Sequence, residues 1–147
     1  MQKQLKKQIM KNLRKIDSET NILTWFEIPV ADTNRAKKFY ETILDIEMVT
    51  RKFPETNEEL TFFPSDPKVI QATSGRVTGV LTKSELNEPS TKGSFVYINA
   101  SPKIQTVLEK VEKAGGKILV PKTPTHFGLI ATIIDSEGNR VGLHAEE

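Results

Sequence analysis

Apolar residues recur along this chain with two periods, one typical of strands and one typical of helices. The segment Ile22–Val30 is rich in β-branched and aromatic residues and predicts a strand. After Asp32, which is suited to cap a helix, apolar residues fall three and four positions apart. They predict a helix whose buried face consists of Ala36, Phe39, Tyr40 and Ile43. Three shorter strands are predicted next, over Glu47–Phe53, Glu59–Pro64 and Arg76–Thr82.

The same plan appears again about seventy residues later. Phe95–Asn99 predicts a strand, and Ser101 with Pro102 predicts a helix start, with a capping hydroxyl followed by proline at the first helical position. Gly115 and Gly116 predict the end of that helix. Strands are predicted over Lys117–Pro121, Leu129–Asp135 and Arg140–Ala145, the last two joined by the turn Ser136-Glu137-Gly138-Asn139.

Residues of the two segments match at nearly constant offsets. The first strands match at an offset of 69, as in Phe26 with Phe95 and Ala31 with Ala100, and the helices match at 68, as in Phe39 with Val107. Each βαβββ module is too small to bury its sheet face alone. The sequence therefore predicts one α+β domain over residues 22–147, with modules at about 22–82 and 94–147 whose half-sheets form a curved mixed sheet around a cleft.

Residues 1–21 form a separate basic extension. Leu5, Ile9, Leu13 and Ile16 lie on one helical stripe, and residues 1–16 hold six Lys or Arg and no acid. Residues 17–147 then carry 15 basic and 19 acidic side chains, a net charge of −4, so the pI near 8.8 describes the extension. The pattern predicts an amphipathic helix that packs on the domain or on a partner subunit. Membrane attachment is the alternative, but the stripe has no Trp or Phe.

Composition removes several classes of function. The absence of cysteine excludes disulfides, thiolate metal sites and a cysteine nucleophile. No apolar run is long enough to cross a bilayer, and the N-terminus is too polar for a signal peptide, which favours a cytoplasmic location. A mildly acidic domain is a poor surface for nucleic acid.

Several motifs are similar to those of a known family. Trp25-Phe26-Glu27-Ile28-Pro29, followed by Asp32, Arg35-Ala36 and Phe39-Tyr40, resembles the first module of the vicinal oxygen chelate superfamily, which includes glyoxalase I, the bleomycin resistance proteins and extradiol dioxygenases. Ala114-Gly115-Gly116-Lys117, Pro121-Lys122-Thr123-Pro124 and the segment 135–143 resemble its second module. The resemblance spans residues 22–144, is that of a glyoxalase-related branch, and implies the two-module fold.

The resemblance also implies where a metal ion would bind. Enzymes of the superfamily place one ligand on the first strand and one on the last strand of each module. The matching positions are Trp25, Gly79, Ser94 and Gly142. An indole, a hydroxyl and two glycines supply no usual ligand for a divalent ion. We therefore expect no metal and no other cofactor, which disfavours glyoxalase I and extradiol chemistry.

Strand alternation extends this set to a predicted cleft lining. The lining residues are Trp25, Glu27, Gly79, Leu81, Ser94, Val96, Gly142 and His144. Glu27 and His144 could form an acid/base pair if they approach each other, although each could equally be a solvated or locally paired side chain. His126 is predicted to be a solvated loop residue.

The sequence therefore predicts a homodimeric protein that binds a small organic molecule between its modules without metal. Two alternatives stay open: a metal-independent isomerase or lyase that uses Glu27 or His144, and a divergent metal-dependent glyoxalase-related enzyme. The sequence leaves open whether there is turnover.

Overall fold

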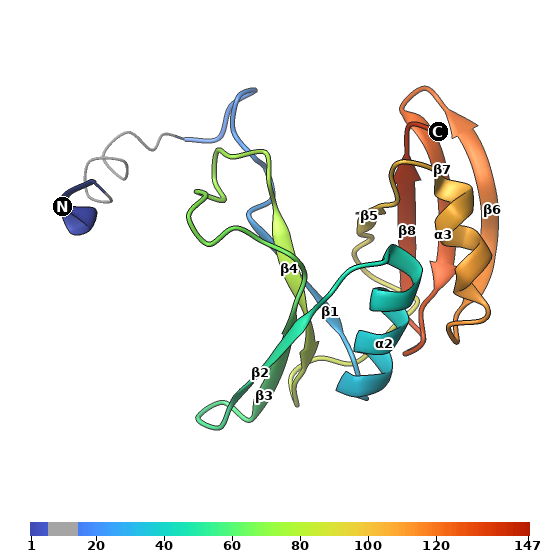
Figure 1. The fold of residues 1–147 in the computed structure, drawn as a ribbon, viewed down its shortest axis with the longest axis horizontal. Helices are drawn as coiled ribbons and strands as arrows, with labels where there is room; N and C mark the ends of the chain where they lie inside the picture. The colour runs from blue at the N-terminus through green and yellow to red at the C-terminus, as the bar shows by residue number, and fades with distance from the viewer. Residues whose placement is uncertain (6–14) are drawn as a thin grey trace. The chain divides into compact units, whose positions relative to one another are not determined.

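A computed structural model describes residues 1–5 and 15–147 (Figure 1). The chain forms two compact units, one of residues 1–26 and 65–78 and the other of residues 27–64 and 79–147. The elements are β1 (Trp25–Pro29), α2 (Thr33–Leu44), β2 (Val49–Phe53), β3 (Glu58–Phe62), β4 (Thr78–Lys83), β5 (Tyr97–Asn99), α3 (Ile104–Val111), β6 (Lys117–Thr125), β7 (Gly128–Ile134) and β8 (Arg140–Ala145).

The strands form two four-stranded sheets with the same internal order. The first sheet runs β1-β4-β3-β2 and the second runs β5-β8-β7-β6, which is the same order with every number raised by four. In the second sheet β5 pairs with β8 in parallel, and the other pairs are antiparallel. The repeated order confirms the predicted α+β fold with two βαβββ modules.

One hydrogen bond recurs in both modules and fixes their equivalence. The Val30 N–H donates to the Thr82 carbonyl at 2.9 Å, and the Ala100 N–H donates to the His144 carbonyl at 2.7 Å. Val30 is thus the counterpart of Ala100, an offset of 70 rather than the predicted 69. Burial agrees, because Ile28 and its counterpart Ile98 are 4% and 7% exposed.

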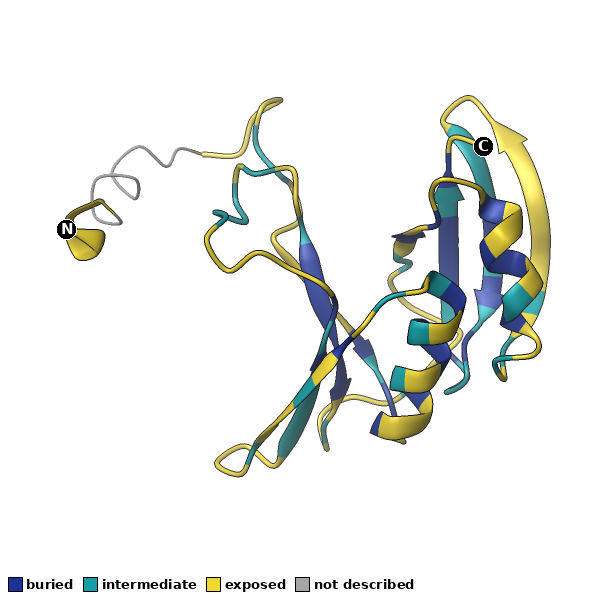
Figure 2. Cartoon of the chain, viewed as in Figure 1, coloured by how far each residue is buried: buried dark blue, intermediate teal, exposed yellow. Residues whose placement is uncertain are grey.

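The two helices bury the faces that their sequences predict. The α2 face of Ala36, Phe39, Tyr40 and Ile43 is buried, and so is the equivalent α3 face (Figure 2). Asp32 caps α2 as predicted, because its Oδ1 accepts from the Arg35 N–H at 3.0 Å.

The predicted start of the second helix is wrong. The α3 helix begins at Ile104, after Lys103 in the cap position, and no side chain caps it. Instead, the carbonyl of Glu147 accepts from the Ile104 N–H at 2.9 Å, and the Ser101 N–H donates to Asn99 Oδ1 at 3.0 Å. A backbone carbonyl from the end of the second module therefore interacts with the N–H that the Ser101 hydroxyl was expected to approach.

Strand β6 is four residues longer than predicted. It continues through Pro121 and Pro124 to Thr125, and register shifts interrupt its pairing with β7. Proline is tolerated here because β6 is at the edge of its sheet, where one side of the strand needs no hydrogen bonds. The strand is almost wholly exposed (Figure 2).

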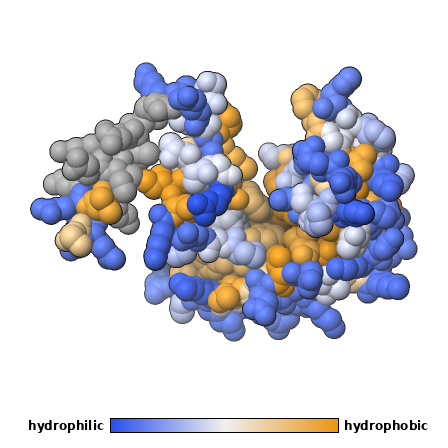
Figure 3. Space-filling model, turned by 45° about the horizontal axis from the view of Figure 1, so that its top comes forward, coloured by the Kyte–Doolittle hydropathy of each residue, from blue (hydrophilic) through white to orange (hydrophobic). Residues whose placement is uncertain are grey.

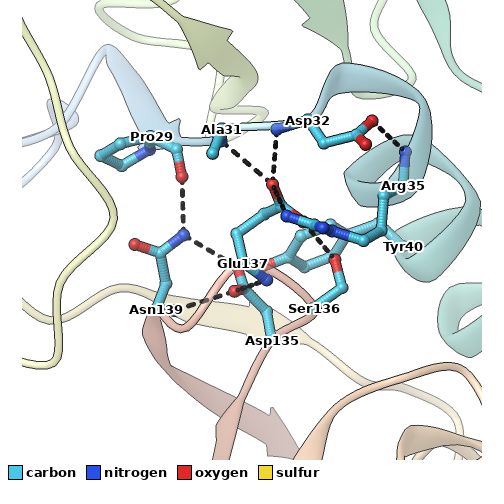
Figure 4. Close-up of polar contacts among 9 residues, drawn as sticks. All are labelled: Pro29, Ala31, Asp32, Arg35, Tyr40, Asp135, Ser136, Glu137 and Asn139. Carbon is cyan, nitrogen blue, oxygen red and sulfur yellow. Dashed lines mark hydrogen bonds and ion pairs between the residues drawn. The ribbon is translucent and has the colours of Figure 1, made fainter.

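The β7–β8 turn binds the first module to the second (Figure 4). The buried Asp135 carboxylate accepts from Tyr40 Oη at 2.7 Å and from Asn139 Nδ2 at 3.0 Å. Asn139 Nδ2 also donates to the Pro29 carbonyl at 2.7 Å. Burial, with help from Asp135, raises the pKa of Tyr40 well above its usual value, so its hydroxyl stays a donor.

Glu137 of the same turn holds the start of α2. Its Oε1 accepts from the Ala31 and Asp32 N–H groups at 3.0 and 2.7 Å, and Arg35 Nε lies 2.6 Å from Oε2. Burial alone would raise the pKa of Glu137, but the hydrogen bonds from Arg35 and the backbone outweigh it and keep the pKa below its usual range. We call residues 135–139 the inter-module turn.

Asn21, at the end of the N-terminal extension, forms hydrogen bonds with the segment 71–75. The Asn21 N–H donates to the Ala72 carbonyl at 2.9 Å, Asn21 Nδ2 donates to the Gln71 carbonyl, and Asn21 Oδ1 accepts from the Gly75 N–H at 3.2 Å. The predicted amphipathic helix of residues 1–21 stays a prediction, because two stripe residues, Ile9 and Leu13, lie outside the described residues.

Among the described residues, no helix is both long and apolar enough to span a bilayer. Figure 3 shows hydrophilic side chains over most of the displayed face, with apolar side chains appearing between them.

Candidate functional site

The register of β4 shows which sheet face each of its residues occupies. Leu81 lies directly opposite Thr61, and directly opposed residues share a face. Glu59, two residues before Thr61, accepts from Thr33 Oγ1 of α2 at 2.5 Å, so this face is the one under the helix. Leu81 and Gly79 therefore face α2 and not the predicted cleft.

Val80 and Thr82 occupy the opposite face of β4. Thr82 Oγ1 donates to Glu27 Oε1 at 2.6 Å, which places the exposed Glu27 side chain on that face as well. In β4 the face shared with Glu27 therefore carries Val80 and Thr82, one residue away from the predicted Gly79 and Leu81, and the place of Glu27 in a binding site stays a prediction.

The second module carries the equivalent face on β5 and β8. Tyr97 lies opposite Gly142, and a Cβ added to Gly142 would come within 2.6 Å of the Tyr97 ring. The Tyr97 ring therefore occupies the space that a side chain at Gly142 would need. Its edge packs on Phe95, with ring centroids 4.8 Å apart and planes at 75°.

A hollow of about 330 Å³ lies beside the Tyr97 ring. We call it the aromatic hollow, and it is lined by Tyr97, Thr125, Phe127, Ile130 and His144. Phe127 is 82% exposed at the tip of the β6–β7 turn, and Tyr97 is 48% exposed. His144 Nε2 contacts the Phe127 carbonyl, so this nitrogen carries a proton and donates.

A second cavity of about 240 Å³ lies between β1 and the second module. We call it the seam cavity, and it is lined by Glu27, Ile28, Pro29, Glu88, Ser90, Lys92, Ser94, Val96, Asn139, Arg140 and Val141. Val96 shares its parity with the buried Ile98, so it lies on the opposite strand face from Tyr97.

The predicted lining residues thus divide among several places. Glu27, Ser94 and Val96 line the seam cavity, while His144 lines the aromatic hollow. Trp25 belongs to the smaller compact unit and is 39% exposed. The structure does not bring Glu27 and His144 into one cavity, and catalysis by either residue stays a prediction.

Tyr97 and Phe127 were missed by the sequence reasoning. Tyr97 belongs to the apolar run Phe95–Ile98, so alternation did not reveal its face, and Phe127 lies in a turn, where strand alternation does not apply. An aromatic residue at a two-residue hairpin turn was an available signal for Phe127, since such turns favour small polar residues. His126 of the same turn is exposed, as predicted.

Comparison with family models decides the family. Residues 22–143 match the model described as the Glyoxalase/Bleomycin resistance protein/Dioxygenase superfamily. The chain belongs to this superfamily. The match covers most of both modules and leaves the basic extension, residues 1–21, outside.

Solved structures of the superfamily share the fold. A mutant glyoxalase I from Zea mays aligns with a TM-score of 0.63 and 23% identity over 83% of this chain. A glyoxalase/bleomycin resistance protein from Albidiferax ferrireducens aligns at 0.62 with 19% identity over 86%. An antibiotic binding protein from a Streptomyces species aligns at 0.59 with 18% identity over 86%.

The lengths of these relatives differ. The chain spans 45% of the maize protein, 100% of the Albidiferax protein and 97% of the Streptomyces protein. At these identities the likeness concerns the fold alone. No curated protein sequence matched the chain.

The residues at the superfamily's ligand positions do not fit a metal ion. The recurring hydrogen bond makes Val80 the counterpart of Gly142, and Phe95 the counterpart of Trp25. These four residues offer an isopropyl group, a glycine and two aromatic rings, none of them a usual ligand. Within residues 1–5 and 15–147, no three His, Cys, Asp or Glu side chains are grouped closely enough to hold an ion.

Proposed function

We propose that this superfamily member binds a small organic molecule with a flat apolar part in the aromatic hollow of its second module, without a metal ion. The aromatic hollow carries the proposal. It is large enough for a small ligand, its lining is mostly apolar, and His144 supplies an imidazole ring for a polar contact.

The hollow offers two kinds of contact to such a ligand. The rings of Tyr97 and Phe127 both border it, so a planar molecule can pack edge-to-face or offset against them. Because His144 Nε2 donates to the Phe127 carbonyl, Nδ1 of the neutral imidazole is an acceptor. A ligand that carries a hydroxyl or N–H group beside its ring therefore suits the site.

We further propose that the protein acts as a homodimer. The superfamily resemblance implies clefts completed by pairing of modules within or between chains. Phe127 and Tyr97 leave a substantial part of their rings exposed, and a second copy that covered them would enclose the hollow. Sedimentation velocity on the full chain tests this directly, and a monomer at high micromolar concentration would contradict it.

Binding is tested with 2-naphthol as the flat probe and cyclohexanol as the non-planar control. In NMR titrations of the full chain with EDTA present, we expect saturable shifts at Tyr97, Ile130 and His144 for 2-naphthol and much weaker ones for cyclohexanol. Tyr97→Ala and Phe127→Ala should weaken 2-naphthol binding about tenfold each, since aromatic pairs and buried ring area are lost.

Leu86→Ala is the matched control, because Leu86 is 88% exposed and does not line the hollow. Its binding should equal that of the wild type. Binding that requires added zinc, nickel or iron would contradict the proposal, as would equal affinity in the Tyr97→Ala protein.

A further inference from the structure

The seam cavity gathers four charged side chains that form no ion pair with any described residue. Two are acidic, Glu27 and Glu88, and two are basic, Lys92 and Arg140. The ion pairs recorded in the described part of the chain join other residues. Acidic and basic side chains therefore line one small cavity without forming ion pairs with each other.

Arg140, one of the two basic residues of the cavity, is held in place. Its guanidinium carbon lies 4.6 Å from the centroid of the Phe95 ring, and its Nη2 donates to the Gly93 carbonyl at 3.4 Å. Stacking on a ring fixes the plane of a guanidinium and leaves its remaining N–H groups able to bind a carboxylate. Lys92 adds a second positive charge at the same cavity.

Glu27, one of the two acidic residues of the cavity, is held in place. Its Oε1 accepts from Thr82 Oγ1 at 2.6 Å, which orients the carboxylate and leaves Oε2 to accept from a cation. Glu88 adds a second carboxylate from the linker between the modules.

Apolar side chains also line the cavity. Ile28 and Val141 are buried at 4% and 2% exposure, and Val96 is half-buried. The volume of about 240 Å³ lies below the range of about 300–1,000 Å³ that is usual for drug-sized ligands. The site thus suits a molecule of amino-acid size with an aliphatic part.

We infer that the seam cavity binds a small zwitterion, an aliphatic amino acid or a close relative. Its carboxylate lies on Arg140 and Lys92, its ammonium group on Glu27 and Glu88, and its side chain on Ile28, Val96 and Val141. This site is separate from the aromatic hollow, which uses none of these residues.

The test compares three probes that share the leucine side chain and differ in their charged groups. L-leucine has both charges, N-acetyl-L-leucine lacks the ammonium group, and L-leucinamide lacks the carboxylate. In NMR titrations of the full chain we expect leucine to shift the backbone amides of Ser90, Ser94 and Arg140 saturably. Each analogue should bind about tenfold more weakly, because it loses a charge-assisted hydrogen bond.

Variants then assign each charge to its partner. Glu27→Gln should weaken leucine about tenfold and leave N-acetyl-leucine unchanged, since that probe has no ammonium group to lose. Arg140→Gln and Lys92→Gln should weaken leucine and leave leucinamide unchanged. Lys122→Gln removes an exposed lysine of β6 outside the cavity and serves as the charge-matched control.

The outcomes separate this inference from the proposed function. No saturable shift with 50 mM leucine would overturn it, as would equal binding of all three probes or a Glu27→Gln effect of the same size on N-acetyl-leucine. The 2-naphthol titration reads the hollow through Tyr97 and His144, so either proposal can fail while the other stands. Unchanged spectra of the variants without ligand establish that they are folded.

Discussion

The two modules share one strand order but differ at the positions that could bind a ligand. In the first module, Val80 fills the central position of the last strand and Thr82 bonds to Glu27. In the second module the equivalent residues are Gly142 and His144, and the Tyr97 ring lies over the glycine. Duplication has thus kept the strand order and placed the contact between an aromatic ring and a last-strand glycine in the second module.

The connections before the last strands differ as well. Residues 63–77 join β3 to β4, while only residues 135–139 join β7 to β8. The long connection belongs largely to the smaller compact unit, whereas the short one binds the first module through Asp135, Glu137 and Asn139. The second module thus supplies both the inter-module contact and the aromatic hollow.

The largest effect is expected when the inter-module turn is broken. Asp135→Ala removes an acceptor from Tyr40, the Asn139 side chain and two backbone N–H groups, and three of these four hydrogen bonds are buried. The free energy of unfolding should fall by about 3 kcal/mol or more, because several buried donors are left unsatisfied. Urea denaturation of the full chain measures this change.

Tyr40→Phe is the matched control for that experiment. It removes one hydrogen bond of the set and keeps the ring packing, so it should cost about 1 kcal/mol. Equal costs for the two variants would show that the turn does not hold the modules together.

Substitutions at the equivalent last-strand positions, Val80 and Gly142, should have the next largest effect. Val80→Ala empties a fully buried position, so stability should fall by about 2 kcal/mol. Gly142→Ala should cost less than about 1 kcal/mol, because the half-exposed Tyr97 ring can move out of the way. The more informative measurement for Gly142→Ala is 2-naphthol binding. The affinity for 2-naphthol should change, although the free energy of unfolding hardly changes. Unchanged binding would mean that the position of the Tyr97 ring does not shape the hollow.

The fold was largely predictable where the hydrophobic pattern has a single period. The buried faces of α2 and α3 follow from apolar spacings of three and four, as in Phe39, Tyr40 and Ile43. Faces were missed in strands without alternation. In Phe95-Val96-Tyr97-Ile98 every residue is apolar, so nothing in the pattern shows that Tyr97 and Ile98 lie on opposite faces.

The site was less predictable for a related reason. Which residues gather in a cavity depends on pairing between segments far apart in the chain, such as Tyr97 with Gly142, and the sequence alone does not contain that pairing. The α3 start failed similarly, since the carbonyl that meets Ile104 comes from Glu147, 43 positions away.

The smallest expected effect is on the stability of the fold at acid pH. Because the pKa of Glu137 is lowered in the folded state, its contribution to stability is present above the unfolded pKa, near 4.5, and is lost as the pH falls through the folded pKa. Glu137→Gln should therefore flatten the fall in stability between about pH 5 and 3. Thermal midpoints of both proteins across this range measure the slope, and parallel curves would remove Glu137 from the account of the turn.

The two prolines of β6 have a consequence for self-association. A strand at a sheet edge can recruit a strand from another molecule through its free N–H and carbonyl groups, which is a common route to fibrils. Pro121 and Pro124 interrupt the donors along that edge. Growth of a continuous intermolecular sheet from β6 is thereby opposed, which helps to keep a strand this long and this exposed compatible with a dispersed protein.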